Sequence, residues 1–157
     1  MKIVLQRVRE ASVEVGGEIV CRIGRGLCLL VGVEKNDAET DVDRLARKTA
    51  ELRVFPDAEG KMNRTLSEAG GAVLAVSEFT LAASVRKGRR PSFDNAEEPA
   101  RAAALFERFV TALRSAGLDV LTGVFQAEMQ VRLVNDGPVT FVLESGTGSG
   151  PAGTPLS

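Results

Sequence analysis

The chain has 157 residues, of which 44% are hydrophobic and 26% charged, and its formal net charge is −1 at pH 7. These values are typical of one globular domain with a normal core, and they argue against global disorder and against a broad nucleic-acid-binding surface. Histidine is absent, which excludes Ser-His-Asp and Cys-His triads and His-ligated zinc sites. An enzyme built from this chain must move protons through carboxylates, Lys, water or a group on its substrate.

Other sequence features bear on the compartment. No apolar run approaches the roughly 18 to 20 residues that span a bilayer, and the first residues lack the pattern of a signal peptide. Cys21 and Cys28 lie in strand-like segments without C-x-x-C spacing. We therefore expect reduced core thiols in a cytoplasmic protein, with no membrane partner, metal or cofactor.

The first part of the chain predicts strands joined by short turns. Strands are indicated over residues 2–8, 12–15 and 18–23, the last two as a hairpin around Gly16-Gly17. Residues 26–33 are nearly all apolar, as in a strand that is buried on both faces.

A helix is predicted next. Asn36 can cap it, and Glu39 three residues later completes a capping box. A short strand over residues 53–55 should follow, ending at Pro56. The positions at helical spacing that predict one buried face are Val42, Leu45, Ala46, Thr49 and Leu52.

The second half repeats this alternation. Residues 72–76 predict a buried strand, residues 97–116 a second helix that stops at Gly117, and residues 119–125, 128–134 and 139–144 the closing strands. The core stripe of that helix is expected at Leu105, Phe109, Leu113 and Ala116.

These elements predict an α+β fold, with a largely antiparallel sheet curled toward a barrel and two main helices. Residues 1–145 should form a single domain. The remainder, 146–157, is rich in Gly, Ser, Pro and Thr and is expected to be a disordered tail.

The pair Gly137-Pro138 interrupts an apolar, strand-like stretch near the end of the domain. Gly and Pro are disfavoured inside strands, because Gly has no side chain to pack and Pro cannot donate to the ladder. A hairpin turn between two strands explains the pair. A ligand-facing loop explains it too, since Gly permits close approach of a backbone and Pro fixes its carbonyls.

The segment Ser77-Glu78-Phe79-Thr80 follows a predicted buried strand, a common place for functional residues. A Ser or Thr nucleophile needs an activating base, and no His is present to supply one. Backbone N–H groups at Phe79 and Thr80 could instead stabilise an oxyanion. In the structural alternative the strand simply continues, with Phe79 and Leu81 directed inward.

One local basic patch is present. Arg86, Lys87, Arg89 and Arg90 place four cations within five residues. They are candidates for binding RNA phosphates, or else a solvated loop.

Several blocks of the chain together resemble the bacterial D-aminoacyl-tRNA deacylases, the D-Tyr-tRNA deacylase family, over about residues 1–144. These blocks are residues 2–8 with 11–13, Gly32-Val33-Glu34-Lys35, residues 57–63, Val76-Ser77-Glu78-Phe79-Thr80-Leu81, Arg90-Pro91-Ser92-Phe93, Met129-Gln130-Val131 and residues 135–140. Any one of them would be weak evidence, but their common order and spacing make coincidence improbable.

The resemblance implies a cytoplasmic homodimer that hydrolyses the ester between a D-amino acid, or glycine mischarged on tRNA(Ala), and the terminal adenosine of tRNA. The partner is then the 3′ end of aminoacyl-tRNA and not DNA. It also implies that Gly137-Pro138 is cis and enters the active site of the other subunit, where its carbonyls exclude an L-side chain.

The resemblance further assigns Ser77, Glu78, Phe79 and Thr80 to the catalytic pocket and places Phe125 and Met129 near the terminal adenosine. Family chemistry uses the 2′-hydroxyl of the terminal ribose to help activate water, while a Thr80 nucleophile is a minor alternative. Arg7, a polar residue in an apolar strand, is a candidate brace for the Gly137-Pro138 loop or else an ordinary surface cation.

Glu78 departs from the family pattern, which has glutamine at this position. An ionised Glu only accepts hydrogen bonds, whereas Gln also donates them. A carboxylate should also weaken the binding of a phosphate-rich substrate. The alternative function is therefore a catalytically weak dimer that binds the 3′ end of tRNA.

Overall fold

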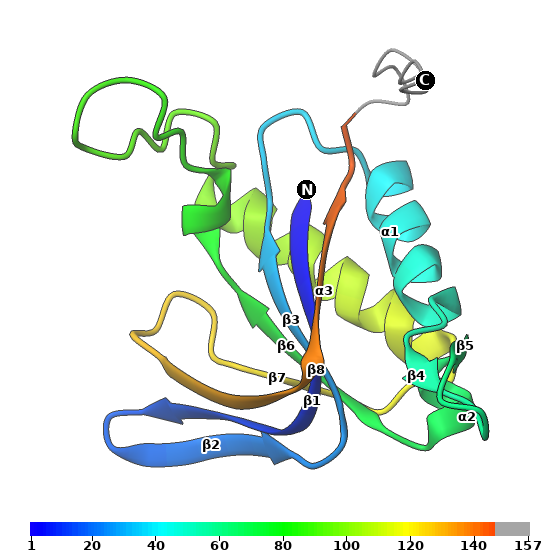
Figure 1. The fold of residues 1–157 in the computed structure, drawn as a ribbon. Helices are drawn as coiled ribbons and strands as arrows, with labels where there is room; N and C mark the ends of the chain where they lie inside the picture. The colour runs from blue at the N-terminus through cyan, green and yellow to red at the C-terminus, as the bar shows by residue number, and fades with distance from the viewer. Residues whose placement is uncertain (147–157) are drawn as a thin grey trace.

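The structure is a computed structural model, and it describes residues 1–146 (Figure 1). The predicted tail therefore lies outside the described residues, apart from Gly146. The strands are β1 (Lys2–Val15), β2 (Glu18–Ile23), β3 (Gly26–Gly32), β4 (Phe55–Pro56), β5 (Met62–Arg64), β6 (Ala72–Ser77), β7 (Val120–Thr122) and β8 (Gln130–Glu144), and the helices are α1 (Glu39–Glu51), α2 (Leu66–Ala69), the 3₁₀ helix η1 (Phe79–Ala82) and α3 (Pro99–Ser115).

The main sheet is organised around β1. Its strands follow the order β2-β1-β3-β6-β7, and β8 pairs with β1 along the other edge. Strand β1 is antiparallel to β2, β3 and β8, whereas β3 and β6, and β6 and β7, are parallel. The sheet curls into a nearly closed barrel (Figure 1). The predicted α+β class is thus confirmed, with two parallel pairs in a sheet that is otherwise antiparallel.

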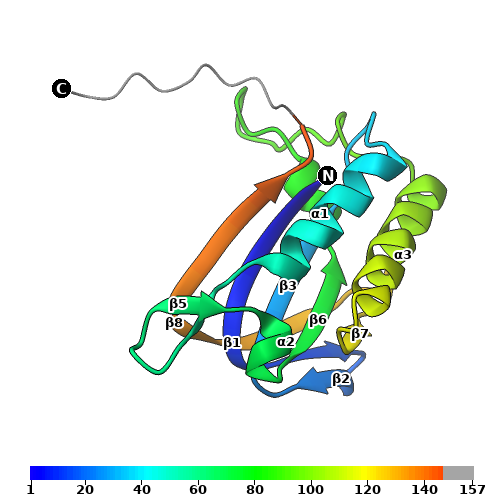
Figure 2. The same cartoon turned by 90° about the vertical axis from the view of Figure 1, so that its right-hand side faces the viewer.

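Helices α1 and α3 lie side by side over one face of the sheet (Figure 2). The predicted stripe of α1 is buried at Val42, Leu45, Ala46 and Thr49, and α3 buries Leu105, Phe109 and Leu113 as expected. Ala116, predicted to belong to the α3 stripe, is exposed, because α3 ends at Ser115 and the chain turns at Gly117 with a φ of 87°.

Strand β3 separates two hydrophobic clusters, which explains its nearly continuous apolar sequence. Leu27 and Leu29 pack in the cluster beneath the helices, while Cys28 packs in the cluster inside the curled sheet. Successive side chains of a strand point to opposite faces, so both faces of β3 are buried. Burial also raises the pKa of the Cys28 thiol to about 11.

Several predicted boundaries change in the structure. Residues 2–15 form one strand instead of two, because β1 pairs first with β3 and then with β2. The N-cap residue of α1 is Ala38 and not the predicted Asn36. The Asp41 carboxylate accepts a hydrogen bond from the Ala38 N–H at 3.1 Å. The short helix α2 was not predicted, because four residues are too few to show a helical period. No helix among residues 1–146 is long and apolar enough to cross a membrane.

Candidate functional site

A cavity of about 520 Å³ opens where the carboxyl ends of β3 and β6 meet the start of α3 and the segment between β7 and β8. Most of its wall is apolar. The predicted site residues that line it are Ser77, Glu78, Phe79, Phe125 and Met129. The rings of Phe106 and Phe125 lie 6.4 Å apart between centroids and form part of this wall.

The segment Ser77-Glu78-Phe79-Thr80 leaves the end of β6 and turns at once into η1. The Glu78 N–H donates to the Val31 carbonyl at 2.8 Å, after which residues 79–82 form the 3₁₀ helix. The alternative in which the strand continues with Phe79 directed inward is wrong, because the Phe79 side chain is 62% exposed. In the described part of the chain, the N–H groups of Phe79 and Thr80 donate to no carbonyl of another element.

Two carboxylates line the cavity in different electrostatic settings. Glu97 is paired with Arg101 at 3.1 Å and also accepts a hydrogen bond from the Glu98 N–H. Glu78 accepts a hydrogen bond from the Thr80 hydroxyl, and no Lys or Arg within residues 1–146 forms an ion pair with it. Glu78 therefore brings an uncompensated negative charge to the cavity.

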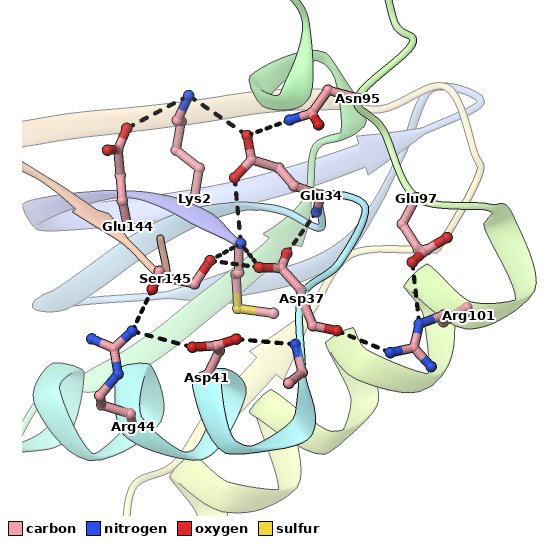
Figure 3. Close-up of polar contacts among 12 residues, drawn as sticks. Lys2, Glu34, Asp37, Asp41, Arg44, Asn95, Glu97, Arg101, Glu144 and Ser145 are labelled. Carbon is pink, nitrogen blue, oxygen red and sulfur yellow. Dashed lines mark hydrogen bonds and ion pairs between the residues drawn. The ribbon is translucent and has the colours of Figure 1, made fainter. Parts of the chain in front are cut away.

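The segment before α3 is fixed to the turn after β3 by polar contacts (Figure 3). The Asn95 side chain donates to Glu34 at 3.0 Å, and the Asn95 carbonyl accepts from the Lys35 N–H at 2.9 Å. Arg101 donates to the Asp37 carbonyl at 2.9 Å while it holds Glu97. These contacts position the Ala96–Pro99 side of the cavity wall.

The buried Asp37 carboxylate ties this turn to both ends of the described domain (Figure 3). It accepts from the Met1 ammonium, from the Ser145 hydroxyl at 2.5 Å and from the Glu34 N–H at 2.7 Å. The beginning of β1 and the residue after β8 therefore meet at the turn that follows β3.

Gly137 and Pro138 lie in a bulge within β8. Thr140 pairs with Gln6 of β1, while Asn135 pairs with Val8, so the residues between them swing out of the ladder. The hairpin interpretation is wrong, because both halves of β8 pair with the same strand. The Gly137–Pro138 peptide bond is cis, and both residues are exposed.

Two side chains of the chain support this bulge. Arg7 donates to the Asp136 carbonyl at 2.9 Å and to the Val54 carbonyl at 2.6 Å. The Asn135 amide accepts from the Val139 N–H at 2.8 Å and donates to the Val139 carbonyl at 3.1 Å. Arg7 thus contacts the loop that it was predicted to brace, whereas the bridging role of Asn135 was missed.

A family model described as D-Tyr-tRNA(Tyr) deacylase matches residues 4–144 of this chain. The chain belongs to this family. The match covers the cavity, the β8 bulge and the loop between η1 and α3. We call residues 84–92 of that loop the basic loop, because they include Arg86, Lys87, Arg89 and Arg90.

Curated relatives support membership in the D-Tyr-tRNA(Tyr) deacylase family. A protein of Symbiobacterium thermophilum named D-aminoacyl-tRNA deacylase is 57% identical over 145 residues, which cover 92% of this chain and 96% of that protein. A protein of Geobacter metallireducens with the same name is 55% identical over 150 residues, covering 96% and 99%.

Solved structures agree in fold. One described as a c-Myc DNA Unwinding Element Binding Protein is 41% identical, with a TM-score of 0.88, and covers 94% of this chain and 100% of that one. Another, described as a probable eukaryotic D-amino acid tRNA deacylase, is 21% identical with a TM-score of 0.77, covering 90% and 97%. At that identity the second likeness shows the fold alone.

In this member of the deacylase family, the predicted site residues fall into three places. Ser77, Glu78 and Phe79 meet Phe125 and Met129 at the cavity, and Thr80 is joined to them through Glu78. The bulge with Gly137 and Pro138 does not line this cavity, and neither does Arg7. The cations Arg86, Lys87, Arg89 and Arg90 occupy an exposed loop.

Sequence reasoning also missed Glu97, which lies in the cavity wall without belonging to a recognisable motif. Residues 1–146 contain no group of three or more His, Cys, Asp or Glu side chains that could hold a metal ion.

Proposed function

We propose that this protein is a cytoplasmic D-aminoacyl-tRNA deacylase, which hydrolyses the ester between a D-amino acid and the terminal adenosine of tRNA. The observation that carries the proposal is the cavity at the ends of β3 and β6, walled by the Ser77–Phe79 segment, in a chain of this family. The two curated relatives are named D-aminoacyl-tRNA deacylase, and their matches to this chain cover 96% and 99% of their own length.

Water attacks the ester carbonyl, and the bond between the acyl carbon and the ribose oxygen breaks, which releases the free amino acid and the terminal ribose hydroxyl of tRNA. As the family resemblance implies, the 2′-hydroxyl of the terminal ribose assists in activating the water, a route that needs no histidine, and the chain contains none. The backbone N–H groups of Phe79 and Thr80 stabilise the oxyanion that develops on the carbonyl oxygen. The hydroxyl of Thr80 donates to Glu78, and attack by this hydroxyl is the alternative route.

Chiral selection is assigned to Gly137 and Pro138 in a homodimer. The bulge is exposed and lies away from the cavity of its own subunit, so it can reach a cavity only on a second copy. Strand β8 exposes Val134, Phe141 and Val142, an apolar surface that suits an interface. There the backbone carbonyls exclude an L-side chain, while glycine passes, so glycyl-tRNA(Ala) is also a substrate.

A deacylation time course tests the proposal. The purified protein should release D-Tyr from D-Tyr-tRNA at least tenfold faster than L-Tyr from L-Tyr-tRNA, because steric exclusion of the L-side chain raises the barrier by about 1.4 kcal/mol or more. It should also cleave glycyl-tRNA(Ala) and sediment with twice the mass of one chain. Equal rates on both tyrosyl substrates would contradict the chiral assignment.

The second candidate is a dimer that binds the 3′ end of tRNA without efficient catalysis. The unpaired charge of Glu78 at the cavity favours it. Under this alternative, D-Tyr-tRNA stays intact at high protein concentration although binding is retained. Because a solved relative is described as binding a DNA element, single-stranded DNA is the appropriate competitor for showing RNA preference.

A further inference from the structure

An aromatic pair stands at the rim of the cavity. The rings of Phe79 and Phe93 lie 5.1 Å apart between centroids at an angle of 53°. Their side chains are 62% and 42% exposed, whereas Phe55, Phe106 and Phe109 are buried in the core. Phe79 also lines the cavity, so the pair is continuous with the proposed active site.

The basic loop rises directly beside this pair. Ser84 and Ser92 exchange backbone hydrogen bonds of 2.8 and 2.9 Å, which close the base of the loop one residue before Phe93. The loop, drawn in green in Figure 1, projects from the body of the molecule. Its tip carries Arg86, Lys87, Arg89 and Arg90.

The charge of this loop is unbalanced. Residues 79–93 contain no acidic residue, and none of the four cations forms an ion pair within residues 1–146. The next carboxylate, Asp94, accepts a hydrogen bond from the Ser92 hydroxyl at 2.7 Å, which holds it at the base of the loop. The cations are therefore free to meet an anionic ligand.

Exposed aromatic faces beside unpaired cations are the features that bind single-stranded nucleic acid. Bases stack on the rings irrespective of sequence, while Arg and Lys neutralise the phosphates. If the cavity holds the esterified terminal adenosine, the preceding nucleotides must leave it across the rim. Phe79 and Phe93 lie on that rim, and the cations lie just outside it.

We propose that Phe93, together with the ring of Phe79, forms a stacking platform for the unpaired nucleotides that precede the terminal adenosine of tRNA, while Arg86, Lys87, Arg89 and Arg90 neutralise their phosphates. This inference rests on the proposed function and adds to it the surface that binds the RNA end outside the cavity. Phe93 is here a binding residue, not a catalytic one.

Comparing two substrates distinguishes the contribution of the stacking platform from that of the cavity. D-Tyr-tRNA carries the preceding nucleotides, whereas D-tyrosyl-adenosine lacks them. In Phe93→Ala, kcat/KM for D-Tyr-tRNA should fall about tenfold, within the range expected for loss of one base–aromatic stack. The value for D-tyrosyl-adenosine should stay within about twofold of wild type.

Three further variants sharpen this test. Phe93→Tyr keeps an aromatic face and should retain wild-type activity on both substrates, whereas Phe93→Leu keeps apolar volume and should behave like Phe93→Ala. Met62→Ala, at a similarly exposed apolar residue of β5, is the control and should change neither value. Replacing the four cations by Ala should lower the salt-dependence slope of tRNA binding by up to about 3, at roughly 0.7 per phosphate contact.

The outcomes distinguish this inference from the proposed function. The platform is overturned if Phe93→Ala lowers activity equally on both substrates or on neither, or if Phe93→Leu retains wild-type activity on D-Tyr-tRNA. The proposed function itself fails if the wild-type protein hydrolyses neither substrate.

Discussion

At the scale of single residues, Glu78 is the departure with the most direct chemical consequence. Its carboxylate lines the cavity, and its one polar contact in the described domain is the Thr80 hydroxyl. We predict that Glu78→Gln raises kcat/KM for D-Tyr-tRNA by about fivefold. Removal of a negative charge near phosphates is worth about 1 kcal/mol, and the amide adds a donor. Deacylation rates at low substrate concentration measure this change.

Glu18→Gln is the matched control, because it removes the same charge from an exposed residue of β2 whose side chain makes no ion pair in residues 1–146. Its activity should equal that of the wild type. If Glu78→Gln instead loses activity by tenfold or more, Glu78 acts as a base, and the Thr80 hydroxyl becomes the preferred nucleophile.

At the scale of elements, the parallel pairing of β3 with β6 depends on a glycine. A Cβ added to Gly26 would lie 1.8 Å from the Ala72 carbonyl oxygen, which is backbone and cannot rotate away. We predict that Gly26→Ala lowers the free energy of unfolding by at least about 2 kcal/mol, because the two strands must separate to admit the methyl group. Urea denaturation monitored by circular dichroism measures the loss.

Gly24→Ala is the control for this substitution. Gly24 lies two residues earlier in the turn before β3, and a Cβ there meets nothing within 4 Å. Its free energy of unfolding should stay within about 0.5 kcal/mol of wild type. Equal stability of the two variants would contradict the assigned role of Gly26.

The elements also show where sequence patterns fail. Hydrophobic periodicity identified α1 and α3, because each helix has apolar residues along one face. It identified β3 because nearly every residue of that strand is apolar. It divided β8 at Gly137-Pro138 because local residue preferences are the same for a hairpin and for a bulge. What distinguishes a bulge from a hairpin here is the pairing with β1: Val8 pairs with Asn135 before the Gly-Pro pair, and Gln6 pairs with Thr140 after it.

At the scale of the whole molecule, the site could be predicted only in parts. The motif around Ser77 identified one wall of the cavity, while Phe125 and Met129 were assigned to the pocket by the family resemblance alone, because no local pattern marks them. Glu97 had no local signal, because its position depends on contacts between the start of α3 and the turn after β3. Such long-range contacts set which residues share a cavity, and no single segment encodes them.

The pH dependence of stability is also a property of the whole domain. Hydrogen bonds lower the pKa of Asp57, chiefly from the Asn63 side chain, and that of Asp41, chiefly from the Ala38 N–H. Thr65, through its backbone N–H, does the same for Glu68. A carboxyl whose folded pKa lies below its unfolded value stabilises the fold above the unfolded pKa, and this contribution is lost as pH falls through the folded pKa.

We therefore predict that the urea midpoint is constant near neutrality and falls steadily as pH drops from about 5 to about 2, the window of these carboxyl groups. Asp57→Asn should lower the midpoint at neutral pH and flatten its decline in acid, because residue 57 no longer titrates. Glu18→Gln, which removes a carboxylate without a hydrogen-bond partner in residues 1–146, should leave the neutral midpoint unchanged. A decline in Asp57→Asn as steep as in wild type would show that Asp57 does not contribute to the acid response.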